Sequence, residues 1–400
     1  MGYIIILGAS LSQKPVYLEA KKLRLKIVGI DKNLNSPCKK YCHNFIFESF
    51  KNTKACIQQL KKLNVKFSGI VTFGAEASIE VATIAKYFNL NSVKPKVAKW
   101  TTYKSLRSKR LNDKRVLIPK FLVLKKIENK LKFKFPFIVK PVDSSGSRGV
   151  SFVKNKVEYL KAFKEAQRVS LKKEVIVEEY IKGKELSIEG FVLNKKLFVT
   201  GIADRYYLDI KKTQPSIVEF MGVMPSKINI QLADKVNSVF NKSIKALEID
   251  GGPVKGDLII KKNNVYVLEI ASRTSTAFAA EMQRYSSGIN LPKILVLWSI
   301  GEKIEKKLIY KNCKNFISHR YLNHKPGKII KMDGLKESRN SKGIKILKML
   351  KKVKKGDFLD KINYMNRILY VISCSNDYQK SIELSKKALR KIKIFYERKK

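Results

Sequence analysis

Residues 135–153 read FPFIVKPVDSSGSRGVSFV, and the interpretation of the fold starts from this stretch. Two runs of β-forming residues flank a loop of serines and glycines, with Lys140 in the first run. Gly146 and Gly149 let backbone N–H groups approach an anion closely, and the serine hydroxyls add donors. A strand follows the loop directly, and the GxxxxGK[ST] pattern of a Walker loop is absent. We predict a phosphate-binding lid between two strands, with Lys140 beneath it; a plain hairpin turn is the alternative.

The first 95 residues alternate short apolar runs with helical patterns, beginning with YIIILGAS at residues 3–10. Strands separated by single helices are typical of a parallel, doubly wound sheet, so we predict a Rossmann-like domain here. Only Gly8 of a dinucleotide-binding GxGxxG turn is present. Glu76 follows a predicted strand, at the edge where ligands of open α/β sheets gather. It is a candidate substrate contact, although a carboxylate there also stabilises a helix N-terminus.

The remainder of the chain mixes strands and helices in another order. A linker-like segment, SVKPKVAKW, is followed by a basic helix, TTYKSLRSKRLN, and by the lid unit, and several strands then end in the hairpin KGDLIIKKNNVYVLEI. The last ninety or so residues repeat an α+β pattern. We therefore predict an α/β and α+β multidomain chain with domains over residues 1–95, 96–311 and 312–400.

Composition excludes several classes of protein. A hydrophobic content of 44% over 400 residues argues against disorder, and no apolar run is long enough to span a bilayer. Five cysteines without a CxxC pair fit a reducing interior, so we expect a cytoplasmic protein. The net charge of +51 would suit a polyanion partner, but the lysines are spread through every segment. We interpret the charge as a compositional bias and do not expect a nucleic-acid site.

The segment VIVEEYIKGKEL, residues 175–186, has the pattern of an apolar strand that runs into a hinge. Main-chain groups of such a hinge can hold adenine, and a carboxylate one turn later can accept hydrogen bonds from the two ribose hydroxyls. Glu185 lies at that position. The alternative is an ordinary solvated glutamate after a Gly-Lys turn.

The hairpin at residues 255–270 places two acids against each other. If residues 262–264 form a three-residue loop, Asp257 lies directly opposite Glu269, with Val267 facing Ile259 on the same side. Opposed carboxylates have Cβ atoms about 4.5–5.5 Å apart and repel each other unless a cation lies between them. Magnesium carried by a polyphosphate suits this position, since it prefers oxygen ligands. A purely structural pair is the alternative, and a register slip of one residue would remove the argument.

Taken together, these segments resemble the ATP-grasp ligases, and the resemblance follows the order of motifs along nearly the whole chain. It implies a two-lobed ATP-grasp fold between a Rossmann-like domain and a small C-terminal domain, as in carbamoyl-phosphate-synthase-like and L-amino-acid-ligase-like members. The residues carried over are Lys104 and Lys140 for the phosphates, Ser145, Gly146, Ser147 and Gly149 for the lid, Glu178, Ile181 and Glu185 for adenine and ribose, Asp257 and Glu269 for the metal, and Arg273 for the transferred phosphate.

Two positions depart from the family pattern. Ala271 stands where the family usually has an Asn as third metal ligand, and Asp257 stands where Glu is common. These departures leave open whether one or two magnesium ions bind, with water or Ser272 as a replacement ligand. An inactive member of the family is a further alternative.

The resemblance implies a carboxylate–amine ligase that uses ATP and Mg²⁺, with Mn²⁺ as an alternative metal. A small-molecule carboxylate would attack ATP to give an acylphosphate and ADP, and an amine would then displace phosphate. Arg205 falls where family members shape the substrate pocket and could clamp a carboxylate, although it could equally be a surface residue. A carboxylase that forms carboxyphosphate, and a basic polyanion-binding protein without turnover, are the other readings. A homodimer remains open.

Overall fold

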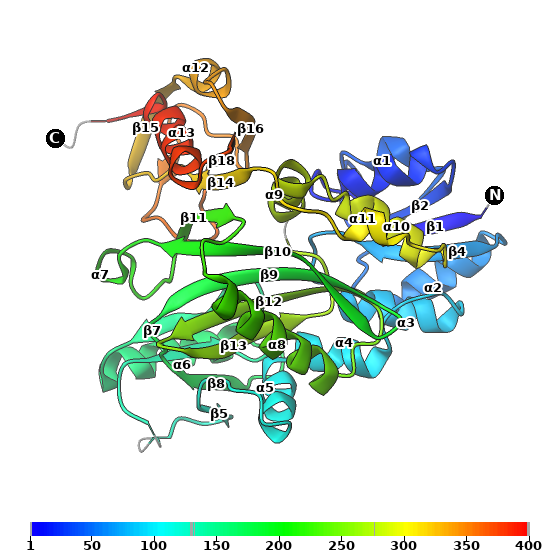
Figure 1. The fold of residues 1–400 in the computed structure, drawn as a ribbon, viewed down its shortest axis with the longest axis horizontal. Coiled ribbons are helices and arrows are strands. Elements are labelled where there is room, and N and C mark those ends of the chain that lie inside the picture. The colour runs from blue at the N-terminus through cyan, green and yellow to red at the C-terminus, as the bar shows by residue number, and fades with distance from the viewer. Residues whose placement is uncertain (1, 129–130, 132, 276, 398–400) are drawn as a thin grey trace.

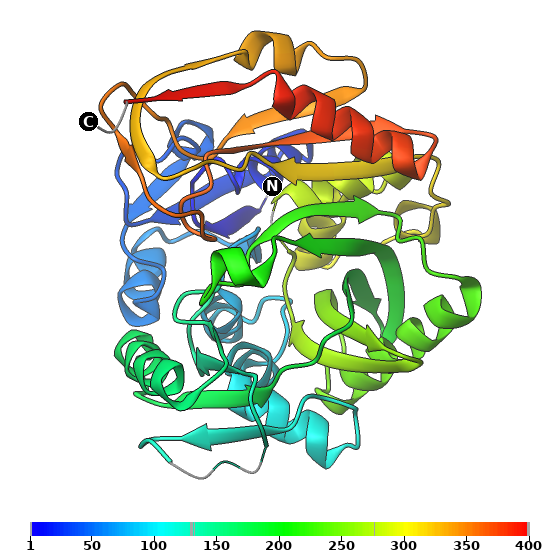
Figure 2. The ribbon, with the colours of Figure 1, turned by 90° about the vertical axis from the view of Figure 1, so that its left-hand side faces the viewer.

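The computed structural model describes residues 2–128, 131, 133–275 and 277–397 and arranges them around four β-sheets (Figure 1). The C-terminal segment and the cyan-to-teal segment lie on opposite sides of the central green strands in both views (Figures 1 and 2). None of the helices within these ranges combines the length and apolar character that a bilayer crossing requires.

A parallel sheet of order β3-β2-β1-β4 forms the N-terminal region. Alternate residues of β1 enter different cores: Ile4 and Ile6 pack with α1 and α10 (Leu291–Ser299), whereas Ile5 and Leu7 pack with α2 and α3. Both faces of the sheet are therefore buried, which explains the continuous apolar strands. The elements are β1 (Tyr3–Leu7), α1 (Lys14–Lys22), β2 (Lys26–Asp31), the 3₁₀ turn η1 (Lys39–Tyr41), β3 (Asn44–Phe47), α2 (Thr53–Lys62), β4 (Phe67–Thr72) and α3 (Ser78–Tyr87).

The expected basic helix is two helices. Tyr103 has an extended backbone and separates α4 from α5, so Lys104 becomes the first residue of α5. An antiparallel sheet of order β5-β8-β6-β7 follows, with α6 packed on one face, and the predicted lid connects β6 to β7. These elements are α4 (Pro95–Thr102), α5 (Lys104–Asp113), β5 (Phe121–Leu124), β6 (Phe137–Pro141), β7 (Ser151–Val153), α6 (Lys156–Val169) and β8 (Val175–Glu179).

An eight-stranded sheet of order β13-β12-β9-β10-β11-β14-β18-β16 forms the centre of the molecule. Phe240 and Val236 of α8 pack against Ile188, Val254 and other apolar residues on one of its faces. The elements are β9 (Lys184–Leu193), β10 (Lys196–Tyr207), α7 (Ile210–Thr213), β11 (Glu219–Met224), α8 (Ile230–Ala246), β12 (Gly252–Lys261), β13 (Asn264–Ala271), α9 (Ala277–Ser287), α10 (Leu291–Ser299), α11 (Lys306–Ile309), β14 (Phe316–Tyr321), β16 (Ile344–Met349) and β18 (Leu369–Ser375).

The remaining C-terminal elements pack beside the last strands of this sheet. A three-stranded sheet of order β17-β15-β19 shares an apolar cluster with β18 and α13, including Ile329, Leu359, Val371 and Leu389. These elements are β15 (Gly327–Asp333), α12 (Leu335–Arg339), β17 (Phe358–Leu359), α13 (Tyr378–Arg390) and β19 (Lys393–Tyr396).

The β12–β13 hairpin opposes Asp257 and Glu269 as predicted, but the predicted loop is wrong. Lys261 pairs with Asn264 across a two-residue turn, so Val267 faces Leu258 rather than Ile259. A register shift then occurs between Asp257 and Leu258, which leaves Leu268 as an extra residue on β13. Because side chains alternate along a strand, this bulge moves Glu269 from the α8 face to the face that carries Asp257.

Candidate active site

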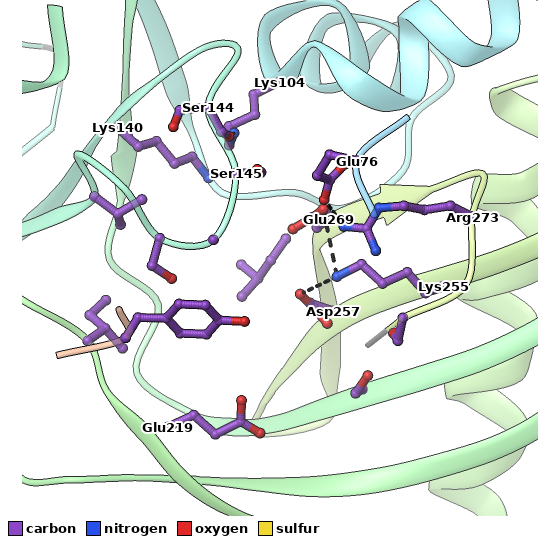
Figure 3. A pocket seen from close by; sticks show the side chains of 18 of the residues that line it. Glu76, Lys104, Lys140, Ser144, Ser145, Glu219, Lys255, Asp257, Glu269 and Arg273 are labelled. Carbon is purple, nitrogen blue, oxygen red and sulfur yellow. Dashed lines mark hydrogen bonds and ion pairs between the residues drawn. The ribbon is translucent and has the colours of Figure 1, made fainter. Parts of the chain in front are cut away.

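A cavity of about 890 Å³ lies between the lid-bearing sheet and the eight-stranded sheet (Figure 3). Its lining includes all the candidate residues from the sequence except Gly149 and Ser272. A Cβ atom on Gly149, whose φ is +71°, would meet Pro141 at 3.2 Å. Gly149 therefore permits the close packing of the lid base against β6 and does not itself face the cavity.

Two lysines lie under the lid at one end of the cavity, which we call the nucleotide end. The Lys104 ammonium donates a hydrogen bond to the carbonyl oxygen of Ser144, within the lid loop. Burial, together with the neighbouring Arg107, lowers the pKa of Lys104 to about 8. Lys140 Nζ lies 2.6 Å from Glu178 Oε2, and both side chains are largely buried. An anion that enters here meets two ammonium groups and the exposed N–H groups of the lid.

The lid itself turns through left-handed backbone conformations. Gly146, Ser147 and Gly149 all have positive φ, at +62°, +57° and +71°. Ser145 and Ser147 line the cavity, as predicted from the sequence. Tyr364, from the segment between β17 and β18, also lines the cavity and reaches the lid, where a Cβ on Gly146 would lie 3.6 Å from its ring.

The hinge follows β8 as the sequence suggested. Ile181 is buried, and Glu185 lies near the start of β9 and lines the cavity. Burial raises the pKa of Glu185, and the charge of Arg205 partly offsets this. Glu178, expected to contribute through its main chain, also directs its carboxylate to Lys140.

The floor of the cavity is one face of the eight-stranded sheet. Cross-strand pairing places Ser187 of β9 beside Asp257, and Glu189 of β9 beside Lys255. Residues two apart on a strand share a face, so Lys255 lies next to Asp257. Lys255 Nζ is 3.2 Å from Asp257 Oδ2 and 3.7 Å from Glu269 Oε1. The cation that separates the opposed acids in this structure is a lysine.

Arginines flank this pair of carboxylates. Arg205 Nη1 lies 3.2 Å from Asp257 Oδ1, and its Nη2 lies 2.9 Å from Glu219 Oε2. Burial raises the pKa of Glu269, but Lys255, Arg107 and Arg273 outweigh it and hold this pKa well below the usual range. Glu269 is therefore ionised at neutral pH.

Arg273 links this floor to the N-terminal region. Its guanidinium forms an ion pair with Glu76, which follows β4, and it donates a hydrogen bond to the carbonyl oxygen of Thr274 at 2.9 Å. Arg273 Nε finds no hydrogen-bond partner among the described residues. The structure thus brings Glu76 and Arg273 together at the edge of the cavity, although they are far apart in the sequence.

The far end of the floor, which we call the acceptor end, holds residues that sequence reasoning missed. Glu189 is 2% exposed, and its Oε1 has no hydrogen-bond partner within the described part of the chain. Burial raises the pKa of Glu189 to about 7, although Ser275 and the charge of Lys255 act to lower it. A carboxyl of this kind can accept or release a proton near neutral pH.

Glu219 of β11 and His319 of β14 lie across the sheet from Glu189 and line the same cavity. Burial alone would raise the pKa of Glu219, but Arg205 and His319 reverse the shift and lower it to about 2. Burial lowers the pKa of His319 to about 4, and its ring lies against Phe278, with centroids 4.3 Å apart and the ring planes tilted by 34°. Glu219 is therefore an anion and His319 a neutral imidazole at pH 7.

A signal for some of these missed residues exists in the sequence. Lys255 precedes Asp257 by two positions, and Glu189 follows Glu185 by four, so a period of two along β12 and β9 puts them on the cavity face. No local pattern identifies Glu219 or His319, since they face the cavity only through the order of β11 and β14 in the sheet.

The two carboxylates suit one magnesium ion. Across the residues that the structure describes, no group of three or more His, Cys, Asp or Glu side chains could hold a metal alone. Magnesium, however, is usually bound by one or two carboxylates together with substrate phosphates and water. Asp257 and Glu269 at the end of a phosphate-binding cavity match that donor set.

Comparison with known proteins agrees with this geometry. The model of the ATP-grasp domain family matches residues 133–280. D-alanine–D-alanine ligase of Geotalea uraniireducens (strain Rf4) is 31% identical over 142 residues, which cover 35% of this chain and less than half, 44%, of that relative. D-alanine–D-alanine ligase of Pseudothermotoga lettingae is 24% identical over 281 residues, 68% of this chain and 88% of the relative.

The fold is shared over a greater length. The crystal structure of an L-amino acid ligase from Bacillus licheniformis superposes with a TM-score of 0.84 over 100% of this chain and 99% of that one, at 18% identity. At such identity the superposition establishes the fold alone. The family match itself covers the segment that carries the lid, the hinge and the metal hairpin, so residues 133–280 of this chain are similar to an ATP-grasp domain.

Proposed function

We propose that this protein is an ATP- and Mg²⁺-dependent carboxylate–amine ligase that joins its substrates through an acylphosphate. The observation that carries this proposal is that three features line one cavity: the lid with its two lysines, the opposed pair Asp257 and Glu269, and a buried acid, Glu189, with a pKa of about 7. A simple nucleotide-binding protein would need the first two but not the third.

ATP would lie with its phosphates under the lid, against Lys104 and Lys140, and its adenine and ribose at Ile181 and Glu185. Mg²⁺ held by Asp257 and Glu269 would neutralise charge on the β- and γ-phosphates. The lysines position the phosphates and stabilise charge, which is the main task of the protein in phosphoryl transfer. Closure of the lid would exclude water, because water would hydrolyse the acylphosphate.

In the first step an oxygen of the substrate carboxylate bonds to the γ-phosphorus, and the bond from that phosphorus to the β,γ-bridging oxygen breaks, which releases ADP. Arg273, which lines the cavity and pairs with Glu76, would stabilise the acylphosphate. In the second step the amine nitrogen attacks the acyl carbon, and the carbon–oxygen bond breaks so that phosphate leaves. Glu189 is suited to take the proton that the amine loses, since its pKa lies near 7.

The domain division at residues 95 and 311 is part of this proposal. All strands of the parallel sheet lie before residue 95, which supports the first boundary. Around the second, β14, β16 and β18 continue the sheet of β9 to β13, and His319 of β14 lines the cavity. The third region would therefore complete the acceptor end. The five cysteines carry no disulfide, which supports the prediction of a cytoplasmic protein.

The proposal is tested by measuring Mg²⁺-dependent release of ADP and phosphate against pairs of small carboxylates and amines, with bicarbonate as one of the acids. Stimulation that requires both an acid and an amine, and that is lost in Glu269→Gln, is the expected result. Stimulation by bicarbonate alone would replace the ligase by a carboxylase, and a lack of nucleotide binding would overturn the catalytic proposal.

A further inference from the structure

Lys255 occupies a defined place among the metal-binding carboxylates. It lies on β12, its side chain is 11% exposed, and the residue directly across on β13 is Ala271. The next pair on the same face is Asp257 and Glu269. The lysine therefore stands opposite the position at which this chain lacks a third oxygen ligand.

The Lys255 ammonium lies between the two acids. It is 3.2 Å from Asp257 Oδ2 and 3.7 Å from Glu269 Oε1, and Figure 3 shows the side chain ending between them. Two anions in a largely buried site already hold one fixed cation.

The small side chain across the hairpin makes room for this lysine. Directly opposed residues have Cβ atoms only about 4.5–5.5 Å apart, so a longer polar side chain at position 271 would compete with the Lys255 stem for the same space. The methyl group of Ala271, 4% exposed, does not. The side chains of Lys255 and Ala271 thus fit together. The pair provides a cation, Lys255, and lacks the metal ligand that the family usually has at position 271.

We infer that the Lys255 ammonium permanently fills one of the cation positions between Asp257 and Glu269, so that this enzyme works with a single divalent ion. That ion enters with the nucleotide and takes the oxygen atoms that Lys255 leaves free. A second divalent ion is excluded because it would need to approach the same oxygens to about 2.0–2.1 Å, where the ammonium repels it. This inference deepens the proposed function and rests on it for the nucleotide-bound state.

The test counts manganese ions on the full-length protein. Mn²⁺ is titrated into protein saturated with the non-hydrolysable analogue β,γ-imido-ATP, and free Mn²⁺ is followed by electron paramagnetic resonance. The unmodified protein should bind one ion per chain beyond the background without nucleotide. Lys255→Met and the double variant Lys255→Met/Ala271→Asn should bind a second ion, with the double variant binding it more tightly.

Two controls separate the lysine from other causes. Ala271→Asn alone should still bind one ion, because the ammonium remains. Lys261→Met removes an exposed lysine from the same strand and should leave the count unchanged. A thermal melt establishes that each variant folds, and Mn²⁺ alone should raise the melting temperature of Lys255→Met, whose opposed acids lack their cation.

Each outcome has a distinct meaning. Two ions on the unmodified protein, or two on Ala271→Asn with its lysine intact, would overturn the inference and leave the ligase proposal standing. One ion on both Lys255 variants would also overturn it, since the lysine would then exclude nothing. No nucleotide-dependent Mn²⁺ binding by the unmodified protein would overturn the proposed function itself.

Discussion

The two ends of the cavity are built in different ways. At the nucleotide end, Lys140 and the lid belong to one continuous hairpin, and Lys140 has Glu178 as its ion-pair partner. At the acceptor end, Glu189, Glu219 and His319 belong to three strands of one sheet. The nucleotide end is thus built around one local hairpin, whereas the acceptor end depends on the order of strands in the sheet. The nucleotide end should tolerate changes at the acceptor end, and the reverse should also hold.

The largest expected effect that separates the two ends comes from Glu189→Gln. Loss of a general base typically costs at least about 10²-fold in rate, so the amine-dependent turnover should fall by about that factor. Affinity for nucleotide should change little. Steady-state rates and calorimetric titration with β,γ-imido-ATP measure the two quantities, and Glu302→Gln, an exposed acid outside the cavity, is the control.

The pH dependence sharpens this prediction. The Glu189 carboxyl has a pKa of about 7, so it is protonated below that pH and ionised above it. Amine-dependent turnover should therefore rise with pH through about 7, and this rise should vanish in Glu189→Gln. An unchanged pH profile in the variant would assign the base to another residue.

The converse substitution to Glu189→Gln is Lys140→Met, which changes the nucleotide end. A hydrogen bond to a charged group contributes about 1.5–3 kcal/mol, so nucleotide affinity should fall by about 10- to 100-fold. The KM for the amine should stay within a factor of about 2, since Lys140 lies outside the acceptor end. Lys154→Met, an exposed lysine just after β7, should change neither value. Equal losses in both affinities would contradict the separation of the two ends.

A matched pair of glycine variants probes the backbone of each end. Gly149→Ala adds a Cβ at a positive φ and at 3.2 Å from Pro141, whereas Gly222→Ala adds one 2.6 Å from the His319 ring. The first should weaken nucleotide binding and destabilise the fold by about 1–2 kcal/mol. The second should displace His319 and raise the KM of the acceptor substrate alone. Denaturant unfolding and substrate titrations measure these effects.

The smallest expected effect is proton uptake by Lys104. The pKa of Lys104, about 8, lies below the ordinary value, and a bound polyphosphate would favour the charged form and raise this pKa. Nucleotide binding should therefore take up most of one proton at pH 9 but only about a tenth of one at pH 7. Calorimetry in two buffers of different ionisation enthalpy detects this, and Lys104→Arg, which stays protonated, should abolish it.

The same contrast explains what the sequence could predict. Lys140, the lid and the hinge lie in short segments whose residue types and spacing are characteristic, so their positions in the cavity follow the prediction. The predicted pairing of Asp257 with Glu269 is correct, but it assumes a three-residue loop. The turn has two residues, and the bulge at Leu268 brings the two acids opposite each other again. A bulge of this kind has no local signature in VYVLEI, since each residue there suits a regular strand.

The acceptor end could not be predicted for a different reason. Glu219 meets Arg205 across the β10–β11 hairpin, but His319 is a hundred residues further along and reaches the cavity only because β14 pairs with β11. The sequence predicts magnesium between the opposed acids, whereas the structure places the Lys255 ammonium there. The roles of the site residues, a homodimer, and the absence of a nucleic-acid site remain predictions.

The account depends most on the acylphosphate, and oxygen transfer tests it directly. The acid that stimulates turnover is labelled with ¹⁸O in its carboxylate, and the phosphate released with the amine present is analysed by mass spectrometry. One carboxylate oxygen should appear in each phosphate, because the carbon–oxygen bond breaks when the amine attacks. Phosphate without label, formed at the same rate as the amide, would show that the carboxylate never bonds to phosphorus and would contradict the proposed ligase.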